Sequence, residues 1–298
     1  MQVTEETLET RPAQAQPART LTPEQIGQFE RDGYLLLENH FTPEEVRLLL
    51  DEIPHVFAED SPRRIKETSG AVRSVFAVHT TNHTFRCLSY LNRLVEPARQ
   101  LLGSEVYIHQ FKVNAKVALE GDQWEWHQDF LYWHKEDGMP SPRVLTAVVF
   151  LQDVDEFNGP MLLIPGSHRE GMIDVEAQPV NAPSAGGDGA RWMPTLTADL
   201  KYKIDRDILA DLLRRHSILA TKGAAGFTLF FHGNLFHASA TNLSPNDRVG
   251  VFITYNSIEN MLDEVEHPRP AFIASRDFSP IVPVPDDSLL KLRHDPDE

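Results

Sequence analysis

Apolar and polar positions follow two different periods along this chain. Over the first hundred residues, apolar side chains recur at helical spacing, for example at Val46, Leu49 and Ile53. Beyond residue 105, short runs rich in β-branched and aromatic residues replace that pattern, which is typical of strands. The sequence therefore predicts helices first and a mainly β region after them.

Two helix starts carry the same local signal: a threonine, a proline at the first helical position, and a Gln or Glu three residues after the threonine. They begin at Thr22 and Thr42. A further helix is expected within residues 91–102, where Pro97 either kinks the helix or marks a new start.

Short segments bounded by turn signals are predicted to be strands. The turns between them are rich in Gly, Pro, Asn and Ser. The predicted strands lie at 34–37, 106–113, 144–151, 161–164, 227–231 and 249–255. Many short strands at this spacing indicate a β-sandwich or a barrel.

The chain is expected to form one domain behind a polar arm. Residues 1–20 have no basic start and no apolar run, so they predict a flexible arm and not a secretory signal. Residues 21–298 form the domain, mainly β with flanking helices. An insertion over about 176–218 is expected between two strands, with a Pro/Gly-rich loop at 177–189 and a helix near 206–215.

Composition narrows the class of partner. The net charge of −16 comes with no basic stripe, which disfavours nucleic acid and anionic membranes as partners. No apolar run approaches the roughly 18 to 20 residues that span a bilayer. The single cysteine, Cys87, excludes an internal disulfide, fits a cytoplasmic protein and is expected to be core packing. A homodimer is compatible with the sequence.

The chemical signal begins at His127 and Asp129. On a strand or an extended strand end, two residues at this spacing point to the same face. An imidazole and a carboxylate side by side are two thirds of the facial triad that binds non-haem iron(II). The pair alone is weak evidence, because a surface His and Asp in a loop would look the same.

A distant histidine should supply the third ligand, and both His232 and His237 are candidates. His237 is favoured because Ser239 and then Arg248, on the next predicted strand, follow it. An arginine there can bind the distal carboxylate of a dicarboxylic acid, and a hydroxyl can add a hydrogen bond. The alternative for His232 is a structural or gating residue near the pocket.

Several stretches of the sequence resemble the phytanoyl-CoA dioxygenase superfamily, and within it the bacterial trans-4-proline hydroxylases and the ectoine hydroxylases. The resemblance covers about residues 20–275. The matching stretches are 109–116 (HQFKVNAK), 126–130 (WHQDF), 133–140 (WHKEDGMP), 158–160 (NGP), 164–168 (IPGSH) and 237–248.

The resemblance implies a fold, a ligand set and an activity. The expected core is a double-stranded β-helix, also described as jelly-roll or cupin-like. The implied reaction uses iron(II), 2-oxoglutarate and O2 to hydroxylate a small-molecule substrate. A carboxylate at 129, where related halogenases have a small residue, indicates hydroxylation or another oxidation. The implied iron ligands are His127, Asp129 and His237, and the implied co-substrate residues are Arg248, Ser239, Gln110 and Asn114.

The substrate signal is weaker. Trp133 and Phe130 are candidate pocket walls, and Arg269 or Arg276 is a candidate partner for a substrate carboxylate, although a solvated surface arginine is the alternative for each. The run 136–138 (EDG) is expected to be a turn in which glycine allows a positive φ.

Comparison of motifs favours a proline-like or other free or derivatised amino acid. Ectoine hydroxylases typically carry Ser and Glu-Thr where this chain has Gln128 and Leu131-Tyr132, which makes ectoine the alternative. Tailoring of a peptide-derived natural product is equally compatible. Three further alternatives are an acyl-CoA substrate, a non-oxidative cupin-type metal protein and a binding protein with a vestigial site. Cupin-type chemistry would not need Arg248, and an acyl-CoA would favour basic residues at the pocket mouth, against which the strong acidity of the chain speaks.

Overall fold

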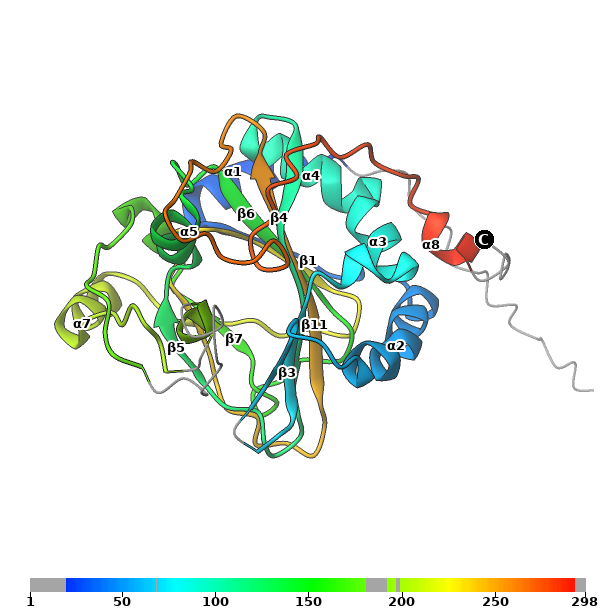
Figure 1. The fold of residues 1–298 in the computed structure, drawn as a ribbon, viewed down its shortest axis with the longest axis horizontal. Helices are drawn as coiled ribbons and strands as arrows, with labels where there is room; N and C mark the ends of the chain where they lie inside the picture. The colour runs from blue at the N-terminus through cyan, green and yellow to red at the C-terminus, as the bar shows by residue number, and fades with distance from the viewer. Residues whose placement is uncertain (1–19, 68, 181–191, 197–198, 293–298) are drawn as a thin grey trace, which may run out of the picture.

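The computed structural model describes residues 20–67, 69–180, 192–196 and 199–292 (Figure 1). The arm expected at 1–20 falls almost entirely outside the described residues, and so does most of the loop expected at 177–189.

Four helices precede the main strands and cover one face of a large sheet (Figure 1). They are α1 (Pro23–Asp32), α2 (Pro43–Ala58), α3 (His83–Tyr90) and α4 (Asn92–Leu102). The predicted starts of α1 and α2 are confirmed, since Thr22 and Thr42 each complete a capping box.

The third predicted helix is also present, but its proline is not a new start. Pro97 lies inside α4, which begins at Asn92. The helix ends at Gly103, whose φ of 59° provides the left-handed cap. Helix α3, just before α4, was not predicted.

The β part consists of two antiparallel sheets. The seven-stranded sheet has the order β1 (Tyr34–Leu37), β9 (Thr228–His232), β6 (Val144–Phe150), β11 (Arg248–Ser257), β4 (Val106–Lys116), β3 (Val72–Phe76) and β2 (Arg64–Lys66). The four-stranded sheet has the order β5 (Trp124–His127), β10 (His237–Ser239), β7 (Met161–Leu163) and β8 (Leu219–Ala220). The prediction of a mainly β protein with flanking helices is therefore confirmed.

Shorter elements complete the described fold. They are α5 (Asp129–Asp137), α7 (Arg206–Arg215), α8 (Ser288–Lys291) and the 3-10 helices η1 (Val78–Thr80), η2 (Ser167–Glu170) and η3 (Met193–Leu196). The predicted helix near 206–215 is α7. It lies between β7 and β8, which pair with each other.

The strict alternation of strand side chains builds two apolar layers. On β11, Val251 and Ile253 face the helices and pack with residues such as Leu49 of α2 and Leu88 of α3. The opposite face of the large sheet meets the small sheet, where Phe252 of β11 belongs to a second cluster that includes β7. The space between the sheets is therefore a packed core over part of its length.

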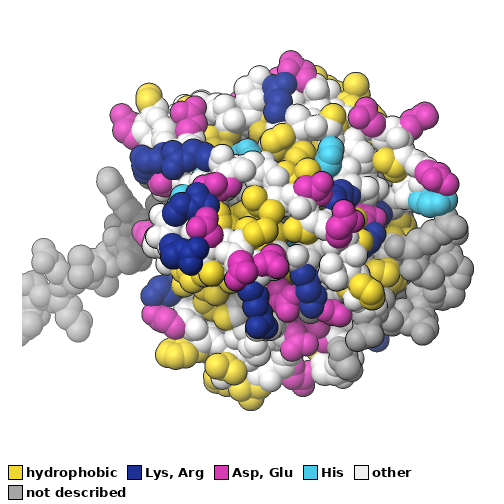
Figure 2. All heavy atoms as spheres, turned by 90° about the vertical axis from the view of Figure 1, so that its left-hand side faces the viewer, with side chains coloured by type: hydrophobic (Ala, Val, Ile, Leu, Met, Phe, Trp, Pro, Cys, Tyr) yellow, Lys and Arg dark blue, Asp and Glu magenta, His cyan; other side chains and the backbone are white. Residues whose placement is uncertain are grey.

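The surface carries mixed charges. Figure 2 shows Lys and Arg side chains interspersed with Asp and Glu on the face that carries α7. Pairs such as Arg215 with Glu170 and Lys203 with Asp199 account for some of this mixture. Among the described residues, no helix has the length and apolar character needed to cross a membrane.

One glycine allows the α2 start to pack against the sheet. Gly226 has a φ of +89°, and a Cβ there would lie 2.5 Å from the carbonyl oxygen of Phe41. The Gly226 carbonyl accepts a hydrogen bond from the Phe41 amide at 2.9 Å. Gly226→Ala should therefore lower the free energy of unfolding by about 2 kcal/mol or more, measured by urea denaturation.

Gly27→Ala is the matched control for this substitution. Gly27 lies inside α1, and a Cβ added there would meet no atom within 4 Å. Alanine there should leave stability unchanged or raise it by up to about 1 kcal/mol, because alanine favours helix. Equal losses in the two variants would contradict the steric explanation.

Candidate active site

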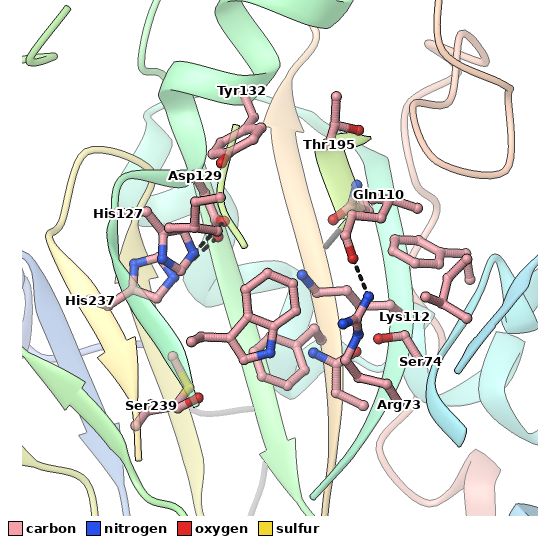
Figure 3. Close-up of a pocket in the computed structure, with 18 of the residues that line it drawn as sticks. Arg73, Ser74, Gln110, Lys112, His127, Asp129, Tyr132, Thr195, His237 and Ser239 are labelled. Atoms are coloured by element: carbon pink, nitrogen blue, oxygen red, sulfur yellow. Dashed lines mark hydrogen bonds and ion pairs between the residues drawn. The ribbon is translucent and has the colours of Figure 1, made fainter. Parts of the chain in front are cut away.

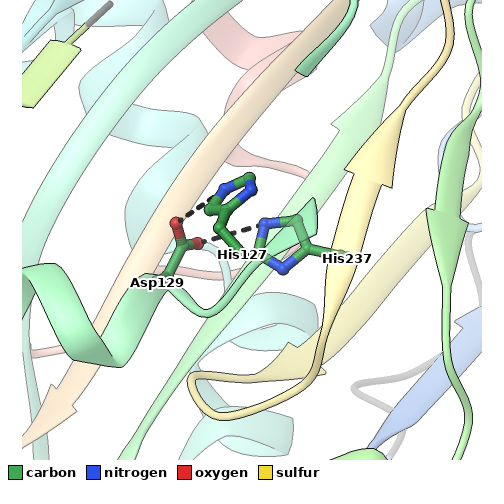
Figure 4. A group of neighbouring side chains, drawn as sticks. All are labelled: His127, Asp129 and His237. Atoms are coloured by element: carbon green, nitrogen blue, oxygen red, sulfur yellow. Dashed lines mark ion pairs between the residues drawn. The ribbon is translucent and has the colours of Figure 1, made fainter. Parts of the chain in front are cut away.

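Three ligand-type side chains converge at one end of the small sheet. His127, Asp129 and His237 present their ligand atoms within 4.8 Å of one another (Figure 4). Nε2 of His127 lies 3.6 Å from Oδ1 of Asp129, and Nε2 of His237 lies 3.7 Å from Oδ2. Two nitrogens and one oxygen donor thus surround one point, which is the donor set of a facial triad.

Strand pairing explains how residues so distant in sequence meet. β10 pairs antiparallel with β5, and His237 is the direct cross-strand partner of His127. The two imidazole centroids are 4.2 Å apart. Asp129 is the first residue of α5 and is not on the strand itself. Gln128 before it keeps an extended backbone, with φ −116° and ψ 126°, so the alternation expected for a strand end still turns the Asp129 side chain toward His127.

Both imidazoles are held in the orientation that a metal site needs. Nδ1 of His127 lies 2.7 Å from the Glu125 carbonyl oxygen, and Nδ1 of His237 lies 3.0 Å from that of Leu235. A carbonyl can only accept, so Nδ1 carries the proton on each ring and Nε2 keeps its lone pair. Both lone pairs face Asp129.

The protonation states match this arrangement. Burial lowers the pKa of His237 to about 4, and the neighbouring His127 acts in the same direction. Burial alone would raise the pKa of Asp129, but His237 and His127 in their protonated forms, together with Lys112, outweigh it and hold that pKa well below its usual range. A neutral imidazole and an ionised carboxylate are the forms that coordinate metals.

Gln128 fixes the turn between the two ligands. Its side chain is fully buried. The amide nitrogen donates to the carbonyl oxygens of Asn234 at 2.7 Å and Gly171 at 2.8 Å, and the amide oxygen accepts from the Ile173 backbone at 2.8 Å. These bonds connect the segment that carries His127 and Asp129 to the loop that precedes His237.

The triad opens into a cavity between the two sheets (Figure 3). Its walls come mainly from β3, β4, β5, β10, β11, α5 and the segment around η3. The cavity is rich in cations although the chain as a whole is acidic. The cations that line it are Arg73, Lys112, Lys116, Arg248 and Arg269, and the acids are Glu67 and Asp129. Such a lining attracts an anionic ligand.

Arg248 is a buried cation of the cavity whose charge no acid among the described residues neutralises. It is buried, with 3% of its surface exposed, and its guanidinium lies over the Phe150 ring at 5.5 Å. Its Nε and Nη1 atoms have no hydrogen-bond partner among the described residues. Burial lowers its pKa to about 10, so it stays charged at neutral pH. A buried charge without a counter-ion is costly unless a ligand supplies one.

The other residues predicted for the co-substrate also line the cavity. Ser239 is two residues beyond His237 on β10. Gln110 and Asn114 project from β4, and Oδ1 of Asn114 is buried without a hydrogen-bond partner among the described residues. The amide nitrogen of Gln110 donates to the Ile273 carbonyl oxygen at 2.9 Å, which ties the C-terminal run to this wall.

Sequence reasoning missed three cations in the cavity. Lys112 and Lys116 lie on the same face of β4 as Gln110 and Asn114, and the alternation of that strand was sufficient to find them. Lys116 is the cross-strand partner of Arg248. Burial and the nearby Arg248 lower the pKa of Lys116 to about 7.

Arg73 was missed for a different reason. It lies on β3, which is too short to give a clear pattern, and its guanidinium lies 5.1 Å from the Trp124 ring centroid. It also hydrogen-bonds the Leu196 carbonyl oxygen.

The candidate substrate residues divide into two pairs. Trp133 and Arg269 line the cavity. Phe130 does not line it, because its ring packs behind the wall in an apolar cluster with Met139 and Trp133. Arg276 does not line it either, because its guanidinium donates to the carbonyl oxygens of residues 263 and 137. We therefore retain only the first pair.

The predicted turn at 136–138 is wrong. Glu136 and Asp137 are the last residues of α5, and Gly138, with φ 79°, is its left-handed cap. Asp137 is fully buried and forms a two-point ion pair with Arg269. Burial would raise the pKa of Asp137, but Arg269 and His109 hold it at about 2. Arg269 is thus not a solvated surface arginine.

His232 and Cys87 lie outside the site and have structural roles. His232 ends β9, and its Nδ1 accepts from the Asn234 backbone at 3.0 Å, away from the three-residue cluster. Cys87 lies on the buried face of α3, and burial raises its thiol pKa to about 11.

Relatives of known activity match most of the chain. An ectoine dioxygenase of Bordetella bronchiseptica is 40% identical over 268 residues, which cover 87% of this chain and 84% of that protein. An L-proline trans-4-hydroxylase of Streptomyces griseoviridis is 38% identical over 263 residues, covering 88% and 95%.

A solved structure has a similar fold. EctD from S. alaskensis, with 2-oxoglutarate and 5-hydroxyectoine, superposes with a TM-score of 0.76 at 33% identity, covering 93% of this chain and 90% of that one. The same protein has been solved with bound Fe. The family model for phytanoyl-CoA dioxygenase matches residues 29–250. With most of its length matched and its ligand-type residues brought together, this chain belongs to the phytanoyl-CoA dioxygenase (PhyH) family.

Proposed function

We propose that this chain is an iron(II)- and 2-oxoglutarate-dependent dioxygenase that hydroxylates an unactivated C–H bond of a small amino-acid-like substrate. One observation carries the proposal. A cavity holds both a His-Asp-His cluster with free Nε2 lone pairs and a buried arginine, Arg248, without a counter-ion among the described residues.

His127, Asp129 and His237 would hold the iron. Three protein donors leave three positions of an octahedral ion for other ligands. When bound, iron(II) and 2-oxoglutarate would supply the electrons that activate O2, the oxidant that attacks the C–H bond. The contribution of the chain is to orient the ligands, to exclude water and to place the substrate.

Arg248 would bind the distal carboxylate of 2-oxoglutarate, with Ser239 as a hydrogen-bond donor. Lys116, the cross-strand partner of Arg248, lies at the same end of the cavity and adds positive charge when protonated. Asn114, on the same strand as Lys116, also lines the cavity and would add a polar contact. A non-oxidative cupin-type metal protein would have no use for this buried, unpaired arginine.

The substrate would lie against Trp133, with its carboxylate near Arg269. The relatives named for ectoine and for L-proline are 40% and 38% identical to this chain, so similarity alone does not choose between them. Tyr132 lines the cavity here, where ectoine hydroxylases typically have Thr. We therefore favour a proline-like amino acid, with ectoine as the alternative.

We also infer that the two antiparallel sheets form a double-stranded β-helix core, within one oxygenase domain over residues 21–298. The stretch of about 176–218 would be an insertion in that core. Its described part supports this reading, since it joins the paired strands β7 and β8 and brings Thr195, Leu196 and Leu200 to the cavity. The single cysteine supports a cytoplasmic enzyme.

The metal site is tested by His127→Ala. Loss of one of three protein donors should weaken iron(II) binding by more than about 100-fold, since changes outside the ligand set already cost about 10- to 100-fold. Equilibrium dialysis under anaerobic conditions measures the affinity, and far-UV circular dichroism should stay unchanged.

His232→Ala is the matched control for the metal test, because His232 lies five residues before the ligand His237 but outside the cluster. It should bind iron(II) as the wild type does. Normal binding by His127→Ala, or loss of binding only in His232→Ala, would remove the proposed ligand set.

The co-substrate site is tested by Arg248→Met, which keeps an apolar stem over Phe150 but removes the charge. The KM for 2-oxoglutarate should rise by about 10- to 100-fold, as expected for loss of a charged hydrogen bond. The KM for the substrate should change far less. An equal rise in both KM values would place Arg248 outside the co-substrate site.

The substrate is tested by a screen for the gain of one oxygen atom by mass spectrometry. The wild type receives iron(II), 2-oxoglutarate and, in separate reactions, L-proline, ectoine and other free amino acids. We expect hydroxylated L-proline or a close analogue, with an equivalent amount of succinate. Iron binding with no oxygen gain from any small amino acid would contradict the proposed substrate class.

A further inference from the structure

Asp137 is a buried acid that has no direct place in the proposed reaction. It is fully buried at the end of α5, and it is absent from the residues that line the cavity. An acid in the last turn of a helix also faces the negative end of the helix dipole. The electrostatics of the helix therefore do not explain why an acid stands at this position.

The contacts of Asp137 point to Arg269. Nε of Arg269 donates to Oδ1 at 2.7 Å, and Nη2 donates to Oδ2 at 2.6 Å. These two bonds occupy one edge of the planar guanidinium. The remaining nitrogen, Nη1, is directed to the Thr195 hydroxyl at 3.3 Å, and Thr195 itself lines the cavity. The edge that carries Nη1 is therefore the one presented to the cavity.

The end of α5 is shaped to bring Arg269 to this place. A Cβ on Gly138 would lie 2.7 Å from the Asp263 carbonyl oxygen, so only glycine lets that segment approach. The Asp263 amide donates to the Gly138 carbonyl oxygen at 2.9 Å. Arg276 adds a bond to the Asp137 carbonyl oxygen at 3.1 Å. The chain leading to Arg269 is thus fastened to the helix end beside Asp137.

Asp137 also contacts a second wall of the cavity. Its Oδ2 lies 3.3 Å from Nε2 of His109, which is fully buried. The His109 ring packs edge-on against Trp133, with centroids 5.5 Å apart. One carboxylate therefore pairs with an arginine and lies beside the histidine that packs against an aromatic wall of the cavity.

We propose that Asp137 is a positioning residue for substrate binding, which fixes one edge of Arg269 so that the other edge receives the carboxylate of the substrate. This rests on the proposed function, in which Arg269 faces that carboxylate. A buried ion pair is weak evidence for stability alone, since apolar replacements are often as stable. An apolar side chain at this position could not orient the guanidinium of an arginine in the cavity.

The test compares Asp137→Asn, Asp137→Glu and the wild type, with L-proline and ectoine as the substrate probes. In Asp137→Asn, the KM for the reacting probe should rise by about 10- to 100-fold. The KM for 2-oxoglutarate and the affinity for iron(II) should stay within about twofold, since neither ligand is placed by Arg269. More succinate should form per molecule of hydroxylated product, because a loosely held substrate couples poorly.

Asp137→Glu separates orientation from stability. It keeps the buried charge pair but moves it by one methylene, so it should lose less thermal stability than Asp137→Asn, which leaves Arg269 without its counter-ion, while the substrate KM still rises. Glu264→Gln, which removes an exposed acid from the same segment, is the control and should match the wild type. An unchanged substrate KM in folded Asp137→Asn, or an equal rise for 2-oxoglutarate, would overturn the proposal.

Failure of the proposed substrate class is distinguishable from failure of this inference. If the wild type hydroxylates neither probe, the two proposed substrates are wrong, and a crystal structure of Asp137→Asn then decides the positioning role. A guanidinium of Arg269 that has turned away from the cavity supports it. A guanidinium that keeps its wild-type place without the carboxylate overturns it.

Discussion

The register between β5 and β10 is the constraint on which the site depends. It places His127 directly opposite His237, and the start of α5 then brings Asp129 to both. A shift of one residue would turn one histidine to the opposite face of the small sheet. Gln128 protects this register, because its buried amide bonds three backbone groups on the adjoining loops. The geometry of the three metal ligands therefore depends on hydrogen bonds to the surrounding backbone.

Helix α5 extends that order from the triad to the far end of the cavity. Positions 129, 132, 133, 136 and 137 fall on one helical face, spaced by three or four residues. That face begins with the carboxylate ligand, continues with Tyr132 and Trp133 on the cavity wall, and ends with Asp137 on Arg269. Glu136 joins the same face to the segment after η3 by accepting a hydrogen bond from the Tyr202 hydroxyl at 2.5 Å. One rigid element thus relates the metal to the substrate end.

The features that could be predicted from the sequence are those determined by neighbouring residues. The caps at Thr22 and Thr42, the alternation in β4 and the helix at 206–215 could each be predicted from neighbouring residues. β8 and β10 could not, because two or three residues show no period. The signal at Gly138 was ambiguous, since a positive φ serves both turns and helix caps.

The burial of Arg269 depends on tertiary contacts with Asp137, which no local pattern reveals. The general rule that charged residues are exposed pointed the wrong way for this arginine.

The central claim is that three side chains hold one iron and leave half of its shell open. A crystal structure of the anaerobic iron(II) and 2-oxoglutarate complex tests it most directly. We predict a single iron bound by Nε2 of His127, Nε2 of His237 and one oxygen of Asp129, with all remaining ligands supplied by 2-oxoglutarate and water. Iron bound elsewhere, or a fourth protein ligand closing the shell, would contradict the account.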